Sequence, residues 1–235
     1  MKFNPFITIP LFISAILFGS CNNSDSIREN PIRPTTDSAI NNFPAGNEPV
    51  EIKIGNQIWS TKNLRITHFS NGDLIPEAAS ANDWKKAGEA GKPAWCYYNN
   101  DTTNGEKYGR LYNWFAVNDK RGLAPKGWHV ASDAEWKKLV EQLGGMEVAG
   151  TKLKSTHGWK ENGNGNNMSG FSAVPGGYRY KNGEFNAIDY FTCFWTSSES
   201  YTYSAWFRSI RYDDGGVYRS NFGKQDGYSV RCLKE

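Results

Sequence analysis

GWHVASDAEWKKLVEQLGG, residues 127–145, predicts an α-helix together with both of its ends. Ser132 and Glu135 stand three residues apart, so the hydroxyl can accept a hydrogen bond from a free backbone N–H while the carboxylate accepts one from the N–H of the cap residue. Gly144 offers the left-handed conformation that ends a helix. One buried face is predicted from four apolar residues at helical spacing: Trp136, Leu139, Val140 and Leu143.

Length and composition favour one globular domain with additional terminal residues. The chain has 235 residues, enough to bury a full core without a metal. Aromatic residues make up 14% of the chain, with 9 Trp and 24 Gly, which favours a loop-rich, strand-containing domain whose core is built from large rings. The net charge of +3 is small and scattered, so we expect no nucleic-acid partner.

Residues 1–20 have the order of a secretory signal peptide. Lys2 precedes an apolar run over residues 6–18, which is shorter than the about 20 residues of a helix that crosses a bilayer. The sequence Phe-Gly-Ser-Cys ending at Cys21 resembles the lipobox of bacterial lipoproteins, in which the cysteine receives diacylglycerol. We expect a lipid anchor at Cys21, with an ordinary signal peptide as the alternative. By the same resemblance, Asn22 is compatible with an outer-membrane lipoprotein that faces the periplasm or the cell surface.

The composition changes near residue 50. Residues 21–49 are rich in Asn, Ser, Pro, Thr and Asp, so we interpret them as a disordered tether between membrane and domain. The folded domain is predicted over residues 50–235. It begins with alternating apolar and polar residues around Gly55-Asn56, a pattern typical of a hairpin.

The rest of the domain predicts an α+β fold with two short helices and antiparallel strands. The second helix is expected within residues 109–118, where Leu111, Trp114 and Phe115 have helical spacing. Trp84 lies in a short segment that reads either as loop or as a further helix starting near residue 81. Strands are predicted at residues 94–98, 205–212, 217–220 and 228–232, with a hairpin turn at residues 213–216.

Five motifs occur in one order along the domain: YGRLYNW at 108–114, GWHV at 127–130, GFSAVPGGYR at 170–179, FWTSS at 194–198 and SVRC at 229–232. Together they resemble the Fibrobacter succinogenes major paralogous domain family over about residues 50–235. That family is similar to the C-type-lectin-like fold and, more distantly, to formylglycine-generating sulfatase-modifying enzymes. The resemblance implies a C-type-lectin-like domain in a lipoprotein or secreted protein of the kind found in Bacteroidetes.

The resemblance also implies a disulfide, because the C-type-lectin-like fold links its chain ends. Cys96 and Cys232 both lie in predicted strands near the ends of the domain, so we expect Cys96–Cys232, with Cys193–Cys232 as the alternative. These cysteines are too widely spread to form the closely spaced pair that formylglycine-generating enzymes use. We therefore expect no catalysis of that kind.

No metal or cofactor is expected. The three histidines lack the spacing of metal ligands, and the chain lacks the Glu-Pro-Asn, Gln-Pro-Asp and Trp-Asn-Asp sequences with which C-type sugar-binding lectins hold calcium. No residue is assigned a catalytic role. An alternative is a carboxylate pair for glycoside hydrolysis drawn from Asp189, Glu199, Asp213 and Asp214.

The favoured function is metal-independent binding of a glycan or surface polymer by a membrane-anchored extracytoplasmic module. Aromatic rings would serve as flat platforms, and polar neighbours would orient the ligand. We predict that the ligand contacts cluster on the hairpin around residues 213–216 and its neighbours: Tyr201, Tyr203, Tyr212, Asp213, Asp214 and Tyr218. The alternatives are a structural or adhesion domain without a small ligand, and a glycan-active or formylglycine-generating-like enzyme.

Overall fold

The computed structural model describes residues 49–235, which begin with the predicted hairpin. Strands β1 (Glu51–Ile54) and β2 (Gln57–Ser60) pair antiparallel about Gly55-Asn56. Gly55 has a φ of +60°, which a glycine adopts without steric cost. The predicted hairpin is confirmed. The predicted signal peptide, Cys21 and the tether up to residue 48 lie outside the described residues.

Helix α4 (Asp133–Gln142) is the capped helix that the sequence predicts. The Ser132 hydroxyl accepts from the N–H of Glu135 at 3.3 Å, and the Glu135 carboxylate accepts from the N–H of Ser132 at 2.7 Å. Both halves of the capping box are therefore formed. The four apolar residues of the predicted face are buried, and Gly144 follows the helix with a φ of +101°.

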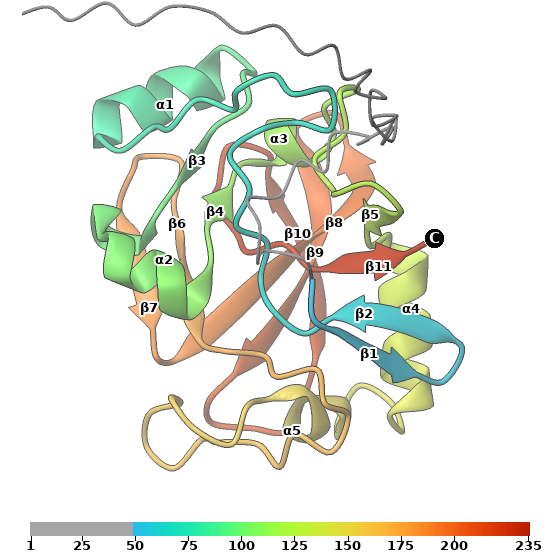
Figure 1. The fold of residues 1–235 in the computed structure, drawn as a ribbon. Coiled ribbons are helices and arrows are strands. Elements are labelled where there is room, and N and C mark those ends of the chain that lie inside the picture. The colour runs from blue at the N-terminus through green and yellow to red at the C-terminus, as the bar shows by residue number, and fades with distance from the viewer. Residues whose placement is uncertain (1–48) are drawn as a thin grey trace, which may run out of the picture. The chain divides into compact units, whose positions relative to one another are not determined.

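A five-stranded sheet forms the largest layer of the domain (Figure 1). Its order is β10-β9-β8-β6-β7, with bounds β6 (Gly176–Arg179), β7 (Phe185–Ile188), β8 (Phe191–Tyr201), β9 (Ser204–Arg211) and β10 (Tyr218–Gly223). The β9–β10 pair confirms the hairpin predicted around residues 213–216. One neighbouring pair, β6 and β8, is parallel, so the strands are not all antiparallel as expected.

Two smaller sheets complete the strands. The order β1-β2-β11-β5 brings the first and last strands of the domain together, with β5 at Trp128–Val130 and β11 at Cys232–Lys234. Strands β3 (Trp95–Cys96) and β4 (Leu111–Tyr112) form a two-stranded sheet. The three sheets include a curled half-barrel. The last strand begins at Cys232 rather than at residue 228, because residues 228 and 229 form only isolated bridges.

The described residues hold five α-helices rather than the two expected. Besides α4 these are α1 (Ala81–Glu89), α2 (Thr102–Tyr108), α3 (Trp114–Val117) and α5 (Ala149–Leu153), and Tyr98–Asn100 form a 3-10 turn. The helix predicted within residues 109–118 is shorter because Leu111 and Tyr112 pair with β3, and the Asn113 side chain caps α3. The α+β class is confirmed.

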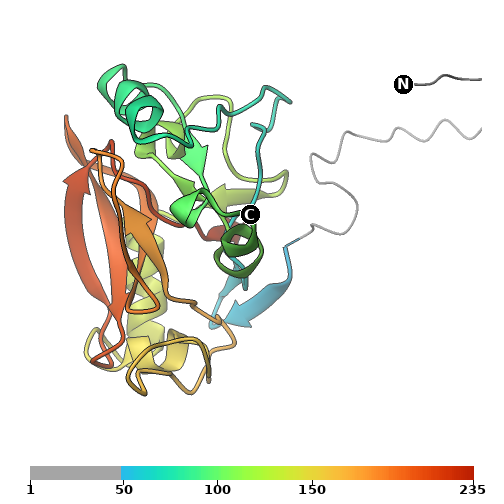
Figure 2. The same cartoon turned by 90° about the vertical axis from the view of Figure 1, so that its left-hand side faces the viewer.

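Core side chains pack against both faces of strands β8 and β9. Successive strand residues point to opposite faces, so Trp195 packs on Tyr228 with ring centres 4.2 Å apart, while Phe194 stacks on Trp136 of α4 at 5.3 Å. Figure 2 shows α4 lying against this sheet. The helix that the sequence specifies best therefore covers one face of the largest sheet.

The predicted Cys96–Cys232 disulfide is not formed, and neither is Cys193–Cys232. All three thiols within residues 49–235 are free and buried. Cys96, Cys193 and Cys232 lie in β3, β8 and β11, which belong to three different sheets. The position of each cysteine is set by the pairing of its own strand, so the three are held in separate sheets. Burial raises the pKa of both the Cys96 and the Cys232 thiol to about 12.

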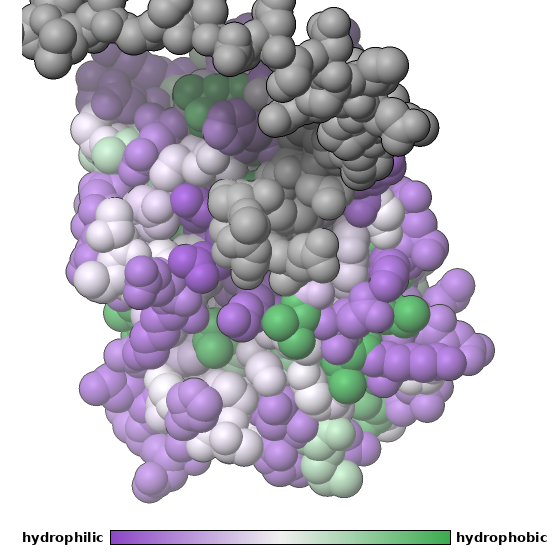
Figure 3. All heavy atoms as spheres, viewed as in Figure 1, coloured by the Kyte–Doolittle hydropathy of each residue, from purple (hydrophilic) through white to green (hydrophobic). Residues whose placement is uncertain are grey.

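The surface in Figure 3 is largely hydrophilic, with hydrophobic residues in small separate groups. None of the helices in residues 49–235 combines the length and apolar character needed to cross a membrane. A few large side chains are nevertheless well exposed, above all Tyr203, Met168 and Tyr201, which are 86%, 75% and 70% exposed. Two of these three residues belong to the predicted ligand site.

Candidate functional site

The structure divides the six predicted ligand residues between the two ends of β9. Tyr201 and Tyr203 lie at the turn from β8 to β9, whereas Tyr212, Asp213, Asp214 and Tyr218 lie at the turn from β9 to β10. The eight residues of β9 span roughly 26 Å at about 3.3 Å per residue. The two groups therefore cannot contact the same sugar unit.

At residues 213–216 the polar groups bind one another. The Arg211 guanidinium donates to both oxygens of Asp213 at 2.9 and 2.8 Å and lowers the pKa of that carboxyl. The Tyr218 hydroxyl donates to Asp214 at 2.7 Å, and the buried Lys154 ammonium donates to the Asp214 carbonyl at 2.9 Å. The acceptors expected to bind sugar hydroxyls thus already hold partners within the protein.

At the other end of β9, three exposed rings share one tip of the sheet. Tyr201 and Tyr203 are 70% and 86% exposed, and Phe222 of β10 is 50% exposed. Phe222 of β10 pairs with Ala205, and Tyr201 of β8 pairs with Ser204. Because Ser204 and Ala205 are consecutive residues of β9, Tyr201 and Phe222 lie at the same end of the sheet. We call Tyr201, Tyr203 and Phe222 the aromatic tip.

Lys224 fixes the turn between β8 and β9, which carries the two tyrosines of the aromatic tip. Its ammonium binds the Glu199 carboxylate and donates to the carbonyl of Thr202 at 2.7 Å. Its backbone N–H donates to the carbonyl of Tyr203 at 3.1 Å. Tyr201 and Tyr203 therefore flank an ordered turn, which reduces the conformational entropy that ligand binding would cost.

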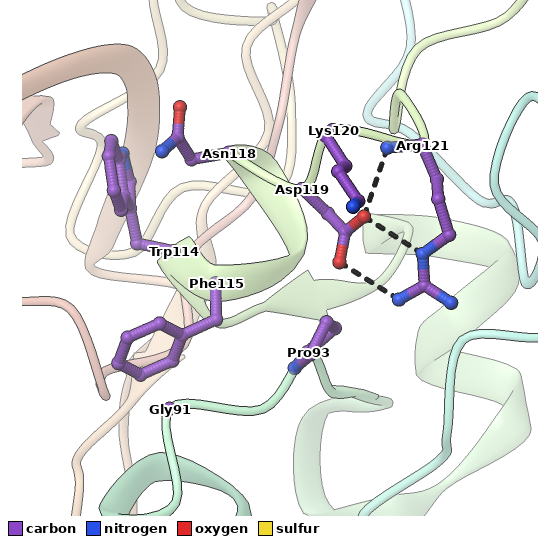
Figure 4. Close-up of a pocket in the computed structure, with 8 residues that line it drawn as sticks. All are labelled: Gly91, Pro93, Trp114, Phe115, Asn118, Asp119, Lys120 and Arg121. Atoms are coloured by element: carbon purple, nitrogen blue, oxygen red, sulfur yellow. Dashed lines mark hydrogen bonds and ion pairs between the residues drawn. The ribbon is translucent and has the colours of Figure 1, made fainter.

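A groove with a volume of about 640 Å³ lies between α3 and the segment that joins α1 to β3 (Figure 4). Gly91 and Pro93 line one side, and Trp114, Phe115 and residues 118–121 line the other. Figure 4 shows the Asn118 amide on the side of Trp114, and the paired Asp119 and Arg121 side chains at the far end. The groove combines rings with amide and charged groups.

Ion pairs hold one end of the groove rigid. Arg121 donates to both oxygens of Asp119 at 2.8 Å and to Asp73 at 3.1 Å, while its guanidinium lies 4.0 Å from the centre of the Phe69 ring. Arg121 lowers the pKa of Asp119, so this carboxylate remains ionised. By contrast, neither Asn118 nor Lys120 makes a side-chain hydrogen bond or ion pair within residues 49–235.

Lys224 connects the groove to the aromatic tip. Its ammonium lies 4.8 Å from the centre of the Trp114 ring, and its carbonyl accepts from the N–H of Trp114 at 2.9 Å. Trp114 in turn lines the groove. No local pattern predicted this groove, because the helical spacing of Trp114 and Phe115 indicated only the apolar face of a packed helix.

Each of the four carboxylates considered for glycoside hydrolysis accepts a hydrogen bond from a different side chain. Asp189 accepts from Tyr108, Glu199 from Lys224, Asp213 from Arg211 and Asp214 from Tyr218. Glu199 lies toward the opposite end of β9 from Asp213 and Asp214. Among the described residues, no group of three or more His, Cys, Asp or Glu side chains is placed to hold a metal ion.

Comparison with known proteins identifies one family. No curated protein and no solved structure matches this chain. The family model described as the Fibrobacter succinogenes major domain matches residues 52–234, which include α4, the groove and the five-stranded sheet. This match confirms the resemblance that the five motifs carry, and the chain belongs to the Fibrobacter succinogenes major domain family.

Proposed function

We propose that this protein is an extracytoplasmic binding module, anchored to the outer membrane by a lipid at Cys21, that binds a glycan or surface polymer. Binding takes place at the groove and the aromatic tip and needs no metal. The observation that carries the proposal is the aromatic tip: exposed rings on a fixed turn, joined to a groove through Lys224. The domain binds rather than transforms its ligand.

Exposed rings favour a binding role because large apolar groups on a protein surface mark interaction sites. A sugar ring presents an apolar C–H face to an aromatic platform and its hydroxyls to polar neighbours. The groove volume of about 640 Å³ lies within the range of small-ligand sites. Asn118 offers both a donor and an acceptor, and Lys120 offers donors, to hydroxyls of such a ligand.

We also assign the domain to the C-type-lectin-like architecture. The sheet order β1-β2-β11-β5 supports this assignment, because it brings the first and last strands of the domain into one sheet. Leu233 of β11 pairs with Trp59 of β2, so strand pairing joins the chain ends in place of the expected disulfide.

A matched pair of double variants in the full chain tests the binding site. Tyr201→Ala with Tyr203→Ala should reduce binding on a glycan and surface-polymer array at least about tenfold. The free energy of unfolding should change by less than about 1 kcal/mol, because both rings are exposed. Tyr212→Ala with Tyr218→Ala is the control and should retain binding. Loss of binding only in this second variant would place the site at residues 213–216 alone, without Tyr201 and Tyr203.

Two further outcomes would contradict the proposal. A wild-type chain that binds no array component would indicate a structural domain. Binding that disappears with EDTA would show a metal-dependent ligand site.

Anchoring is tested separately at Cys21. Cys21→Ala should release the protein from the membrane fraction and abolish incorporation of labelled fatty acid. A variant that still fractionates with the envelope, together with a wild-type chain that takes up no label, would contradict the anchor.

A further inference from the structure

A second pocket, of about 270 Å³, lies between α2, residues 61–65 and the loop around residues 155–174. It shares no lining residue with the groove. Its lining contains four basic residues and one acidic residue, Glu106. The basic residues are Lys62, Arg65, Lys107 and Arg231. We call it the basic pocket.

Arg231 is a fully buried cation at this pocket that has only neutral acceptors. Nε donates to the amide oxygen of Asn63 at 2.6 Å, Nη1 donates to the carbonyls of Ser60 and Phe171 at 2.7 and 2.8 Å, and Nη2 donates to the carbonyl of Ser172 at 3.0 Å. A guanidinium has five N–H groups. One N–H on Nη2 therefore has no acceptor within residues 49–235.

The charge of Arg231 is not neutralised inside the protein. Burial lowers its pKa to about 9, so the guanidinium is still a cation at neutral pH. Buried charges in proteins are normally paired, because an isolated charge in a medium of low polarity is costly. The carbonyls and amide around Arg231 solvate the charge without cancelling it, so a positive potential remains at the pocket.

The rim adds to this potential. The side chains of Lys62 and Arg65 form no ion pair or hydrogen bond within the described residues. Lys107 lies 3.9 Å from Asp189, at the outer limit of an ion pair. Screening by water is weaker in a pocket than on an open surface, so these charges attract an anion more strongly there.

Hydroxyl groups line the same pocket and favour a sugar over a simple anion. The Thr61 hydroxyl donates to the carbonyl of Val50 at 3.0 Å, so its lone pairs are available to accept from a ligand. Thr156 lines the pocket as well. A volume of about 270 Å³ is below that of sites for drug-sized ligands and suits a single sugar unit.

We propose that the basic pocket binds the carboxylate of one hexuronic acid unit of an acidic glycan. The carboxylate binds the accessible side chains of Lys62 and Arg65, and the buried charge of Arg231 behind them adds to the attraction without contacting the ligand. The sugar hydroxyls meet the threonine hydroxyls at the wall. This site is separate from the groove and does not depend on the function proposed for the groove.

Titration of the full chain with small probes at matched ionic strength tests the proposal. The probes are D-glucuronate, D-galacturonate, D-glucose, acetate and sulfate. Binding of a uronate, with glucose inert and acetate weaker, is the expected result. A uronate that does not bind, glucose that binds equally well, or acetate that binds equally well would overturn the proposal. Sulfate that binds more tightly than either uronate would replace it with a site for a tetrahedral anion.

Variants at the rim locate the site without disturbing Arg231, whose four hydrogen bonds also hold the fold. Lys62→Gln with Arg65→Gln should weaken uronate binding at least about tenfold, since bonds from charged donors to a carboxylate are lost. Lys53→Gln with Lys138→Gln removes the same charge from exposed positions outside the pocket and should leave affinity unchanged. Equal losses in the two variants would show general charge attraction and contradict the site.

The two proposed sites can fail independently. Tyr201→Ala with Tyr203→Ala should leave uronate binding intact, because neither residue lines the basic pocket. Loss of uronate binding in that variant would contradict a separate site.

Discussion

Asp133 Oδ1 lies 2.7 Å from Nη2 of Arg208, and this ion pair joins the first turn of α4 to strand β9 of the five-stranded sheet. Arg208 is only 3% exposed, and burial lowers its pKa. The same carboxylate accepts from Nε of Arg219 at 2.9 Å, whose guanidinium lies 3.2 Å from the centre of the Trp206 ring. Asp133 therefore neutralises a buried cation and also anchors an edge strand.

Replacement of Asp133 should destabilise the domain strongly. Asp133→Ala leaves the Arg208 charge buried and unpaired. We therefore expect the free energy of unfolding, measured with denaturant, to fall by about 3 kcal/mol. Glu141→Ala is the control, because it removes an exposed pair with Lys137 at 3.7 Å, and should change stability by less than about 0.5 kcal/mol. Similar losses in the two variants would contradict the role given to Asp133.

The N-terminal cap of α4 should contribute less to the stability of the domain than Asp133 does. Ser132→Ala removes the hydroxyl that accepts from the N–H of Glu135, and we expect a cost of about 1 kcal/mol in thermal or denaturant unfolding. Ser132→Thr retains the acceptor and should recover most of this loss. A Thr variant as unstable as the Ala variant would count against the cap.

Stability should depend on pH through Asp226. Burial raises the pKa of its carboxyl from the ordinary 3.8 to about 6, against the effect of the Lys181 N–H that donates to it at 2.7 Å. Between these two pKa values the folded state holds a proton that the unfolded state releases. The free energy of unfolding therefore falls as the pH rises from about 4 to about 6, and above pH 6 the contribution of Asp226 no longer changes.

We expect this fall to amount to about 2 to 3 kcal/mol in urea unfolding relative to Asp226→Asn, which resembles the protonated form. The variant should therefore be the more stable chain at pH 7. A difference between the two chains that does not change with pH would contradict the raised pKa.

The domain thiols should be unreactive in the native state. Burial raises the pKa of Cys96, Cys193 and Cys232, so they stay protonated and shielded from reagents. Iodoacetamide at pH 7.5 should modify none of them in the folded chain and all three in denaturant without reductant, as peptide mass mapping would show. Labelling that requires prior reduction would reveal a disulfide.

Local structure could be predicted well from the sequence. Ser132, Glu135 and the stripe from Trp136 to Leu143 specify α4, and Gly55-Asn56 specifies the first hairpin, because caps, turns and periodicity depend on residues a few positions apart. The family could also be identified from short motifs. Errors arose where distant segments compete for the same residues, as when Leu111 and Tyr112 pair with β3 instead of forming a helix.

The candidate sites depended on tertiary structure. Periodicity predicted a strand that ends at Tyr212 and begins shortly after Tyr203, but the placement of the two residues at separate turns is decided by the pairing of β9 with both of its neighbours. The basic pocket needs Arg231 to reach Asn63, which is 168 residues away in the chain. The sequence by itself therefore determined the helix, the hairpins and the family. The tertiary structure decided the groove, the pocket and the separation of the cysteines, because these arise from contacts between segments that carry no local signal for one another.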